Sequence, residues 1–372
     1  MNDRSTSPRR RFAFQLGGLA LALAAASPAF AQGAPSFREG KVFTSTNATA
    51  GNELLVYAPA QRGDLALVAR VATSGQGTGA GLGSQGAVAL SSDGRHAFVV
   101  NAASHTVSTF AIRHDGVALA SVVDSGGLTP ISVTESDGTV YVLNAGGAGN
   151  VAGFRNLQGQ LQPIANGARG LSAAGGTGPA QVGFGAGGDV LVVTEKNTNR
   201  ITSFPVRRDG TLGAVVTTAS AGATPFGFAF DRRDHLIVSE APGSAASSYR
   251  YADGSATPLL VSASVPNTQQ AACWVAVTPN GKYAFTANAG SSTVSSYSIA
   301  RTGQLALASA VAGSTGANAG ALDLAVSADG RRLFALAPRS LQVVSFRVEY
   351  DGSLTTLGAG ALPSGGAGLA AN

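Results

Sequence analysis

The sequence predicts an all-β fold, a seven-bladed β-propeller, and three observations support this prediction. A phrase of two strands recurs along the chain, with a polar residue ending the first strand and an aromatic residue nine or ten positions later. A glycine five or six positions after each aromatic residue marks another turn. The copies recur at intervals of 43 to 54 residues, and such periods with several short strands are typical of propellers. The pairs are Asn47/Tyr57, Asn101/Phe110, Asn144/Phe154, Glu195/Phe204, Glu240/Tyr249, Asn288/Tyr297 and Ala337/Phe346, the last without a polar member.

Residues 1–31 have the order of a cleaved export signal. Arg9, Arg10 and Arg11 precede an apolar run at residues 16–26, and small residues follow at 29–31. The apolar run is too short to span a bilayer. The arginines resemble the twin-arginine type of signal, and an ordinary secretion signal is the alternative. We therefore expect a periplasmic or secreted protein with no membrane span once the signal is removed.

We expect the mature chain, residues 32–372, to be one domain and a monomer. Its composition also limits the kinds of partner that it can bind. The signal contributes +3 of the formal net charge of +5, because it carries four arginines and one aspartate. The mature chain is then near +2, and no stripe of basic residues with interleaved aromatics indicates nucleic-acid binding. Cys273 is the only cysteine, so the exported protein is held together without a disulfide.

Local signals predict four antiparallel strands in each blade. Asp-Gly and Asn-Gly pairs between apolar runs accept positive φ and favour hairpins. Inner strands are expected to begin near Gln85, Ile131, Gln181, Phe226, Trp274 and Asp323, one fewer than the copies. We expect residues 366–372 to supply the missing strand by pairing with the strand at residues 41–47. The C-terminal strand then closes the N-terminal blade, and no sheet edge stays open there.

Several segments carry a resemblance to a known family. They are Ser91-Ser92-Asp93-Gly94-Arg95, Val140-Tyr141-Val142-Leu143-Asn144, Leu191-Val192-Val193-Thr194-Glu195, Thr224-Pro225-Phe226-Gly227-Phe228-Ala229-Phe230, Ala271-Ala272-Cys273-Trp274-Val275 and Pro279-Asn280-Gly281-Lys282-Tyr283. Through them the mature chain resembles an exported branch of the seven-bladed propeller lactonases. That family includes 6-phosphogluconolactonases and carboxymuconate cycloisomerases, and Tyr-Val-Thr-Asn-type surface propellers are related to it. The resemblance implies a propeller fold and hydrolysis of a small sugar or carboxylic acid lactone.

Topology predicts the face on which a ligand binds. In a four-stranded blade the inner-strand starts and the loops after the second strands share one rim, which we call the upper rim. The Asp-Gly hairpins lie on the opposite, lower rim. We expect a small-molecule ligand at the upper channel mouth, as is usual for propellers. The residues expected to line it are Glu195, Arg200, Glu240, Asn101, Asn144, Asn288, Gln181, Trp274, His105 and Arg339, with Asn47, Asp323 and Lys196 around them.

Glu195 and Glu240 are the strongest catalytic candidates because they replace asparagine in two consecutive copies. The resemblance matches Glu195 to a strand-end glutamate proposed as an acid/base group in relatives. Glu195 would activate water, with its pKa raised by partial burial and by Glu240 if the two approach. Arg200 would polarise the lactone carbonyl, with Lys196 or an asparagine amide as alternatives. The asparagines are also explained by turn geometry alone, since Asn tolerates left-handed φ.

Other chemistries find less support. Gly81-Leu82-Gly83-Ser84-Gln85-Gly86 matches a dinucleotide fingerprint but precedes a predicted strand rather than a helix. A divalent cation at Glu195 and Glu240 is chemically reasonable, but the family that uses one has six blades, so we expect no metal and no cofactor. Relatives carry histidine near inner-strand starts, whereas His96, His114 and His235 are expected as solvated turn residues on the lower rim. The alternative to a lactone hydrolase is a non-catalytic exported propeller that binds a small polar ligand or a cell-surface protein.

Overall fold

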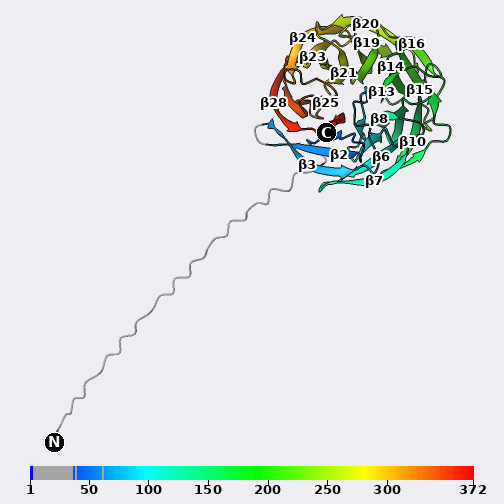
Figure 1. Ribbon diagram of the computed structural model, residues 1–372. Coiled ribbons are helices and arrows are strands. Elements are labelled where there is room, and N and C mark those ends of the chain that lie inside the picture. The colour runs from blue at the N-terminus through cyan, green and yellow to red at the C-terminus, as the bar shows by residue number, and fades with distance from the viewer. Residues whose placement is uncertain (3–36, 38–39, 61–62, 186) are drawn as a thin grey trace. The chain divides into compact units, whose positions relative to one another are not determined.

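The computed structural model describes residues 1–2, 37, 40–60, 63–185 and 187–372. Apart from its first two residues, the export signal predicted at residues 1–31 lies outside the described residues. From residue 40 onward the chain forms seven antiparallel sheets arranged around a central axis, as Figure 1 shows. The predicted seven-bladed β-propeller is therefore confirmed. All regular elements among the described residues are strands, and none of these residues belongs to a helix that could cross a membrane.

Blade 1 combines the first and the last strands of the propeller, and blades 2 and 3 follow it in order. Blade 1 contains β29 (Ala367–Ala371), β1 (Val42–Ser45), β2 (Glu53–Pro59) and β3 (Leu65–Ala72). Blade 2 contains β4 (Val88–Leu90), β5 (His96–Asn101), β6 (Thr106–Ile112) and β7 (Val117–Asp124). Blade 3 contains β8 (Pro130–Ser136), β9 (Thr139–Asn144), β10 (Asn150–Leu157) and β11 (Gln160–Pro163), with the short β12 (Arg169–Gly170) also paired to β10.

Blades 4 to 7 each have four strands in sequence order. Blade 4 contains β13 (Pro179–Phe184), β14 (Val190–Glu195), β15 (Arg200–Pro205) and β16 (Val216–Ala219). Blade 5 contains β17 (Pro225–Phe230), β18 (His235–Glu240), β19 (Ala245–Tyr251) and β20 (Pro258–Pro266). Blade 6 contains β21 (Ala272–Val277), β22 (Tyr283–Asn288), β23 (Thr293–Ile299) and β24 (Leu305–Ser314). Blade 7 contains β25 (Leu324–Val326), β26 (Arg332–Ala337), β27 (Gln342–Val348) and β28 (Leu354–Ala361).

The ring closes as predicted, by pairing the C-terminal strand with the N-terminal one. β29 runs antiparallel to β1, with Val42 opposite Ala371 and Ser45 opposite Ala367. Side chains reinforce the ladder, because Thr44 Oγ1 donates to Gly368 O (2.6 Å) and Ser45 Oγ donates to Ala367 O (2.7 Å). This closure gives blade 1 its inner strand.

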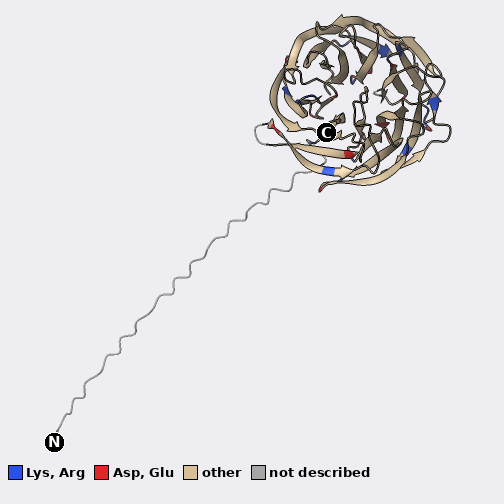
Figure 2. Ribbon diagram, in the orientation of Figure 1, with Lys and Arg blue, Asp and Glu red and all other residues tan. Residues whose placement is uncertain are grey.

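The repeated aromatic residues form the core between the blades. Tyr57, Phe110, Phe154, Phe204, Tyr249, Tyr297 and Phe346 are all at most 2% exposed. They lie on third strands, or on β2 in blade 1, and pack into the spaces between sheets that stack face to face. Charged residues are sparse and scattered over the ribbon, as Figure 2 shows, so the part of the chain that the structure describes has no basic stripe.

Inner strands begin within one to three residues of the predicted positions, and blade 2 differs most. Its inner strand starts at Val88, because the chain before it crosses the channel instead of extending the strand. Elsewhere side chains bridge neighbouring inner strands. The Gln181 amide accepts from Phe228 N (2.6 Å) and donates to Phe228 O (2.9 Å), while Ser132 Oγ accepts from Val182 N. These bonds satisfy backbone groups that an inner edge would otherwise leave unpaired.

Candidate functional site

The strand-end polar residues are buried, so the expectation that they line an open mouth is wrong. Asn47, Asn101, Asn144, Glu195, Glu240 and Asn288 are at most 1% exposed, and Ala337 is fully buried at the corresponding position of blade 7. Each polar member lies beneath a crossover segment, the chain that leads from one blade to the next. Gly75, Gly127 and Gly222 of these segments pass so close that a Cβ on any of them would collide with Asn101, Asn144 or Glu240.

Hydrogen bonds explain the repetition of asparagine. Asn101 Nδ2 donates to Thr106 Oγ1 and Ser108 Oγ of its own blade, and its Oδ1 accepts from Asn52 of blade 1. Asn288 makes the equivalent set of bonds in blade 6, where Asn267 of the crossover segment is the donor to its Oδ1. Among the strand-end residues, only Asn47 has the left-handed turn geometry that we considered for the asparagines, with φ 47°. The amide thus ties its blade to a neighbouring segment, which is the β1–β2 loop of blade 1 for Asn101 and a crossover for Asn288.

Glu195 performs the same fastening with a carboxylate. Its Oε1 accepts from Ser172 N (3.0 Å) and Thr202 Oγ1 (2.7 Å), while Oε2 accepts from Thr198 Oγ1 (2.7 Å) and Ser172 Oγ. Ser172 belongs to the crossover from blade 3 to blade 4. The side chain is 0% exposed, so both oxygens are directed at protein donors. No face of this carboxylate is open to a solvent water in this arrangement.

The remaining predicted residues are spread over the upper rim. Glu240 Oε1 accepts from Gly222 N of the crossover from blade 4 to blade 5 (2.8 Å). Arg200 lies opposite Glu195 in the β14–β15 ladder and is exposed, as is Arg339 beyond β26. His105, at φ 58°, accepts from Thr129 N through Nδ1 (3.0 Å) and so ties blade 2 to the following crossover.

One segment covers the channel on the upper rim, and we did not predict this role from the sequence. We call residues 81–86 the crossing segment, because it precedes β4 of blade 2 yet bonds to four other blades. The Gln85 side-chain amide donates to Val275 O (2.7 Å) and accepts from Val275 N (2.9 Å) across the ring in blade 6. Gln85 N donates to Ala180 O in blade 4, and Val133 N in blade 3 donates to Gly86 O. The Gly-x-Gly-x-x-Gly pattern therefore serves chain crossing and not a dinucleotide.

Glycine is required where the crossing segment meets blade 5. A Cβ on Gly227 would lie 2.1 Å from Gln85 Oε1 and 2.6 Å from Cys273 O. Gly86 itself adopts φ +82°, which disfavours residues with side chains. Below the crossing segment the channel remains hollow, with a cavity of about 400 Å³ between Gln85, Gln181 and apolar side chains of the inner strands.

Asp323 connects blade 7 to the crossing segment, in addition to the bonds from blades 3, 4 and 6. Its Oδ2 accepts from Gly368 N of β29 (3.0 Å), and the carboxyl also accepts from the backbone of Gly86. Oδ1 is buried with no hydrogen-bond partner among the described residues. Burial raises the pKa of this carboxyl from 3.8 to about 7, and the two backbone donors only partly oppose it. The group joins the closing strand to the crossing segment.

Lys196 provides the positive charge at the upper mouth. Its Nζ donates to Gly83 O of the crossing segment (2.6 Å) and lies 5.0 Å from the centre of the Phe226 ring. Phe226 packs on Trp274 at 5.0 Å between ring centres, and Trp274 Nε1 donates to Ser84 O (2.9 Å). Burial lowers the pKa of Lys196. The half-buried ammonium and the aromatic pair together form what we call the Lys196 cluster.

Cys273 lies beside the Lys196 cluster and is a free, buried thiol. Burial raises its pKa to about 11, so it is not a thiolate at neutral pH. The prediction that His235 is a solvated turn residue is wrong. The residue is 7% exposed, and its Nδ1 lies 2.9 Å from Asp231 Oδ2. It packs under Gly303 of blade 6.

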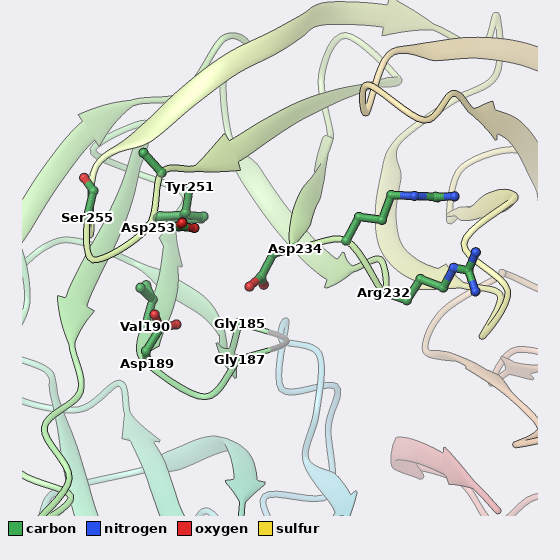
Figure 3. A pocket seen from close by; sticks show the side chains of 11 residues that line it. Gly185, Gly187, Asp189, Val190, Arg232, Asp234, Tyr251, Asp253 and Ser255 are labelled. Carbon is green, nitrogen blue, oxygen red and sulfur yellow. The ribbon is translucent and has the colours of Figure 1, made fainter.

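Grooves between blades open on the lower rim. Figure 3 shows one of about 420 Å³ between blades 4 and 5, where Asp189, Asp234 and Asp253 lie around the space and Arg232 extends away from Asp234. In the described part of the chain, no three acidic, histidine or cysteine side chains are close enough to hold a metal ion. The acidic character of this groove therefore does not by itself define a site.

Comparison with solved structures places the fold among known propellers. A candidate 6-phosphogluconolactonase from Bacteroides fragilis superposes with a TM-score of 0.70 at 17% identity, covering 90% of this chain and 99% of its own. The periplasmic gluconolactonase of Pseudomonas aeruginosa gives 0.67 at 16% identity, with 87% and 96% covered. A functionally unknown protein from Desulfotomaculum acetoxidans gives 0.68 at 13% identity, with 88% and 99% covered.

At such identities the likeness shows the shared seven-bladed fold, and a shared fold does not by itself carry an activity. No protein-family profile matches the sequence, and no individually curated protein matches it.

Proposed function

We propose that this chain is a lactonase-like propeller that binds a small lactone, or the hydroxy acid formed from it, at the Lys196 cluster. The observation that carries the proposal is the half-buried ammonium of Lys196, held over the Phe226 ring, which packs on Trp274, at the upper rim. Partial burial strengthens the attraction of an ammonium for a carbonyl or carboxylate oxygen, because water screens it less. A lactone presents both such an oxygen and a compact ring.

The geometry leaves Lys196 with capacity for a ligand. An ammonium has three N–H donors, and within the described residues one of them is used on Gly83 O. The Phe226 and Trp274 rings lie beside the ammonium and are 8% and 6% exposed, so they offer a ligand a small apolar contact. Two of the structures with the same fold bear lactonase names, which supports a lactone as the ligand class.

The test uses the single tryptophan of the chain as its probe. Titration with glucono-δ-lactone and with gluconate is expected to change Trp274 fluorescence in a saturable way in wild type. Lys196→Met is expected to weaken the apparent affinity at least about tenfold, since a hydrogen bond to a charged donor contributes roughly 1.5–3 kcal/mol. Arg200→Met, which removes an exposed cation of the same rim, should leave it unchanged. Equal affinities in Lys196→Met and wild type would remove this proposal.

Hydrolysis is a second candidate function, favoured by the carboxylate one residue before Lys196. In this scheme Glu195 is the general base, and Lys196 stabilises the developing oxyanion. Because four protein donors occupy Glu195, the crossover that carries Ser172 must move before a water reaches it. The scheme is tested by turnover of a panel of sugar and muconate lactones by wild type and Glu195→Gln. Equal, background-level rates would leave binding without catalysis.

A further inference from the structure

A second cavity lies at the seam where blade 7 meets blade 1, on the lower rim. It has a volume of about 590 Å³, within the usual range of small-ligand pockets. Blade 1 contributes Gly40 before β1, Pro59 at the end of β2 and Asn372 beyond β29 to its walls. Blade 7 contributes Arg332 and Phe334 of β26 and the turn before that strand. We call it the seam cavity.

Arg332 is the unusual group in the seam cavity. Its Nη1 is buried and has no hydrogen-bond partner among the described residues. Buried polar atoms are nearly always paired, and an unpaired charged donor is costly. The neighbouring arginines do not leave a buried donor unpaired. Arg347, opposite Arg332 in the ladder, donates to Glu349 (2.8 Å). The side chain of Arg331 is 85% exposed and extends into solvent. Arg332 is partly exposed and lines the cavity, so a ligand can accept from the guanidinium N–H groups that face the space, whereas the buried Nη1 itself is out of its reach.

The nearby acid, Asp329, is hydrogen-bonded within its own turn and accepts no hydrogen bond from Arg332, although the two charges attract each other. Asp329 also lines the cavity, but its Oδ1 accepts from Ser327 Oγ (2.6 Å) and Arg331 N (3.0 Å) of its own turn. The Ser327 hydrogen bond holds the pKa of Asp329 below its usual value, so the charge stays fixed in the turn. Asn372 is engaged as well, because its Oδ1 accepts from Lys41 N (2.8 Å).

We propose that the seam cavity binds a small carboxylate with an apolar body, such as an aromatic or short aliphatic acid. The carboxylate accepts from Arg332, whose planar guanidinium matches a planar anion. The apolar body packs against Phe334, which is 3% exposed, and Pro59. One guanidinium with apolar walls suits a monocarboxylate better than a phosphate, which needs more donors. A ligand here contacts both partners of the ring closure and therefore stabilises the closed propeller.

The experiment measures the melting temperature and the binding heat of the mature chain with benzoate, hexanoate and the neutral analogue benzyl alcohol. Both carboxylates are expected to raise the melting temperature of wild type in a saturable way, and benzyl alcohol is not. Arg332→Met is expected to lose at least about tenfold in affinity for benzoate. Arg331→Met is the matched control, because it removes an exposed charge one residue away, and it should bind as wild type.

A second variant keeps the test decisive if Arg332→Met folds poorly. Ala328→Trp adds bulk at an exposed wall of the cavity without removing a buried group, and it should block benzoate. Lys196→Met should leave benzoate binding intact, and benzoate should leave Trp274 fluorescence unchanged, so failure of the proposed lactone site is separable from failure here. Equal benzoate affinity in wild type, Arg332→Met and Ala328→Trp, or no binding to wild type, would overturn the proposal.

Discussion

The strand-end polar residues and the crossing segment lie on the same rim but relate to the repeat in opposite ways. Polar strand-end residues recur in six of the seven copies, and they fasten their blades to crossovers or, for Asn101, to the β1–β2 loop of blade 1. The crossing segment occurs once, and it bonds blades 3, 4, 6 and 7 to blade 2 while it covers the channel. Repetition here indicates a structural task, whereas the departure from repetition supplies the Lys196 cluster. The predictions below separate the two roles, from the largest expected effect to the smallest.

Deletion of Pro363 to Asn372 is expected to have the largest effect. It removes β29, the bonds that Thr44 and Ser45 donate to it, and the Gly368 donor to Asp323. Blade 1 then has an open inner edge, so we expect insoluble or cooperatively destabilised protein. Expression yield and thermal unfolding measure this, and unchanged unfolding of the truncated chain would contradict the closure.

Asp323 predicts a pH dependence of stability. Burial raises its folded pKa to about 7 from 3.8, so the folded state prefers the protonated acid. Its contribution is complete below about pH 4 and is lost as the pH rises toward 7, by about 4 kcal/mol at most, at ~1.4 kcal/mol per pH unit. Wild type should therefore lose more stability between pH 5 and pH 8 than Asp323→Asn, measured by urea unfolding at each pH. Parallel losses in the two proteins would show that Asp323 is not the group responsible.

Glu195→Gln tests the fastening role of the strand-end residues. The amide provides one acceptor oxygen where the carboxylate satisfies four donors, so Ser172 or Thr198 loses a partner. We expect a loss of about 2–3 kcal/mol in the free energy of unfolding, the usual scale for a buried charge-assisted bond. Arg200→Gln, exposed on the facing strand, should change it by less than about 0.5 kcal/mol. An unchanged free energy of unfolding in Glu195→Gln would show that this carboxylate does not fasten the crossover to its blade.

Gln85→Ala tests the crossing segment with a smaller effect. It leaves the N–H and C=O of Val275 without the amide that pairs with both. We expect a loss of about 1–2 kcal/mol, the scale for neutral hydrogen bonds, and faster hydrogen exchange at the Val275 amide than at other β21 amides. Unchanged protection of Val275 would mean that another group pairs with it in solution.

The sequence predicted the fold because its signals are local and repeated. The polar and aromatic pairs and the Asp-Gly turns define the blades, and the short count of inner strands predicted the closure by β29. The burial of Glu195 was not predictable in the same way, since Ser172 covers it from the preceding blade and 23 residues away in sequence. Lys196 was named as a cation of the mouth, but its partner Gly83 is 113 residues distant.

The crossing segment did leave a signal in the sequence. Three glycines lie within residues 81–86, and glycine is frequent where backbone must pass close to other groups. Gly175, Gly176 and Gly178 precede the inner strand of blade 4 in the same way, so this signal does not single out the crossing segment. What no local pattern indicates is the direction of the crossing, because Gln85 meets Val275 across the ring at a separation of 190 residues. Contacts of that kind depend on the closed ring itself.

The most direct test of the central claim, that the non-repeated Lys196 cluster is the ligand site, is the Trp274 fluorescence titration with glucono-δ-lactone and gluconate. The account predicts saturable binding to wild type and Arg200→Met, weakened at least about tenfold in Lys196→Met. The same affinity in all three proteins, or no response in wild type, would contradict it.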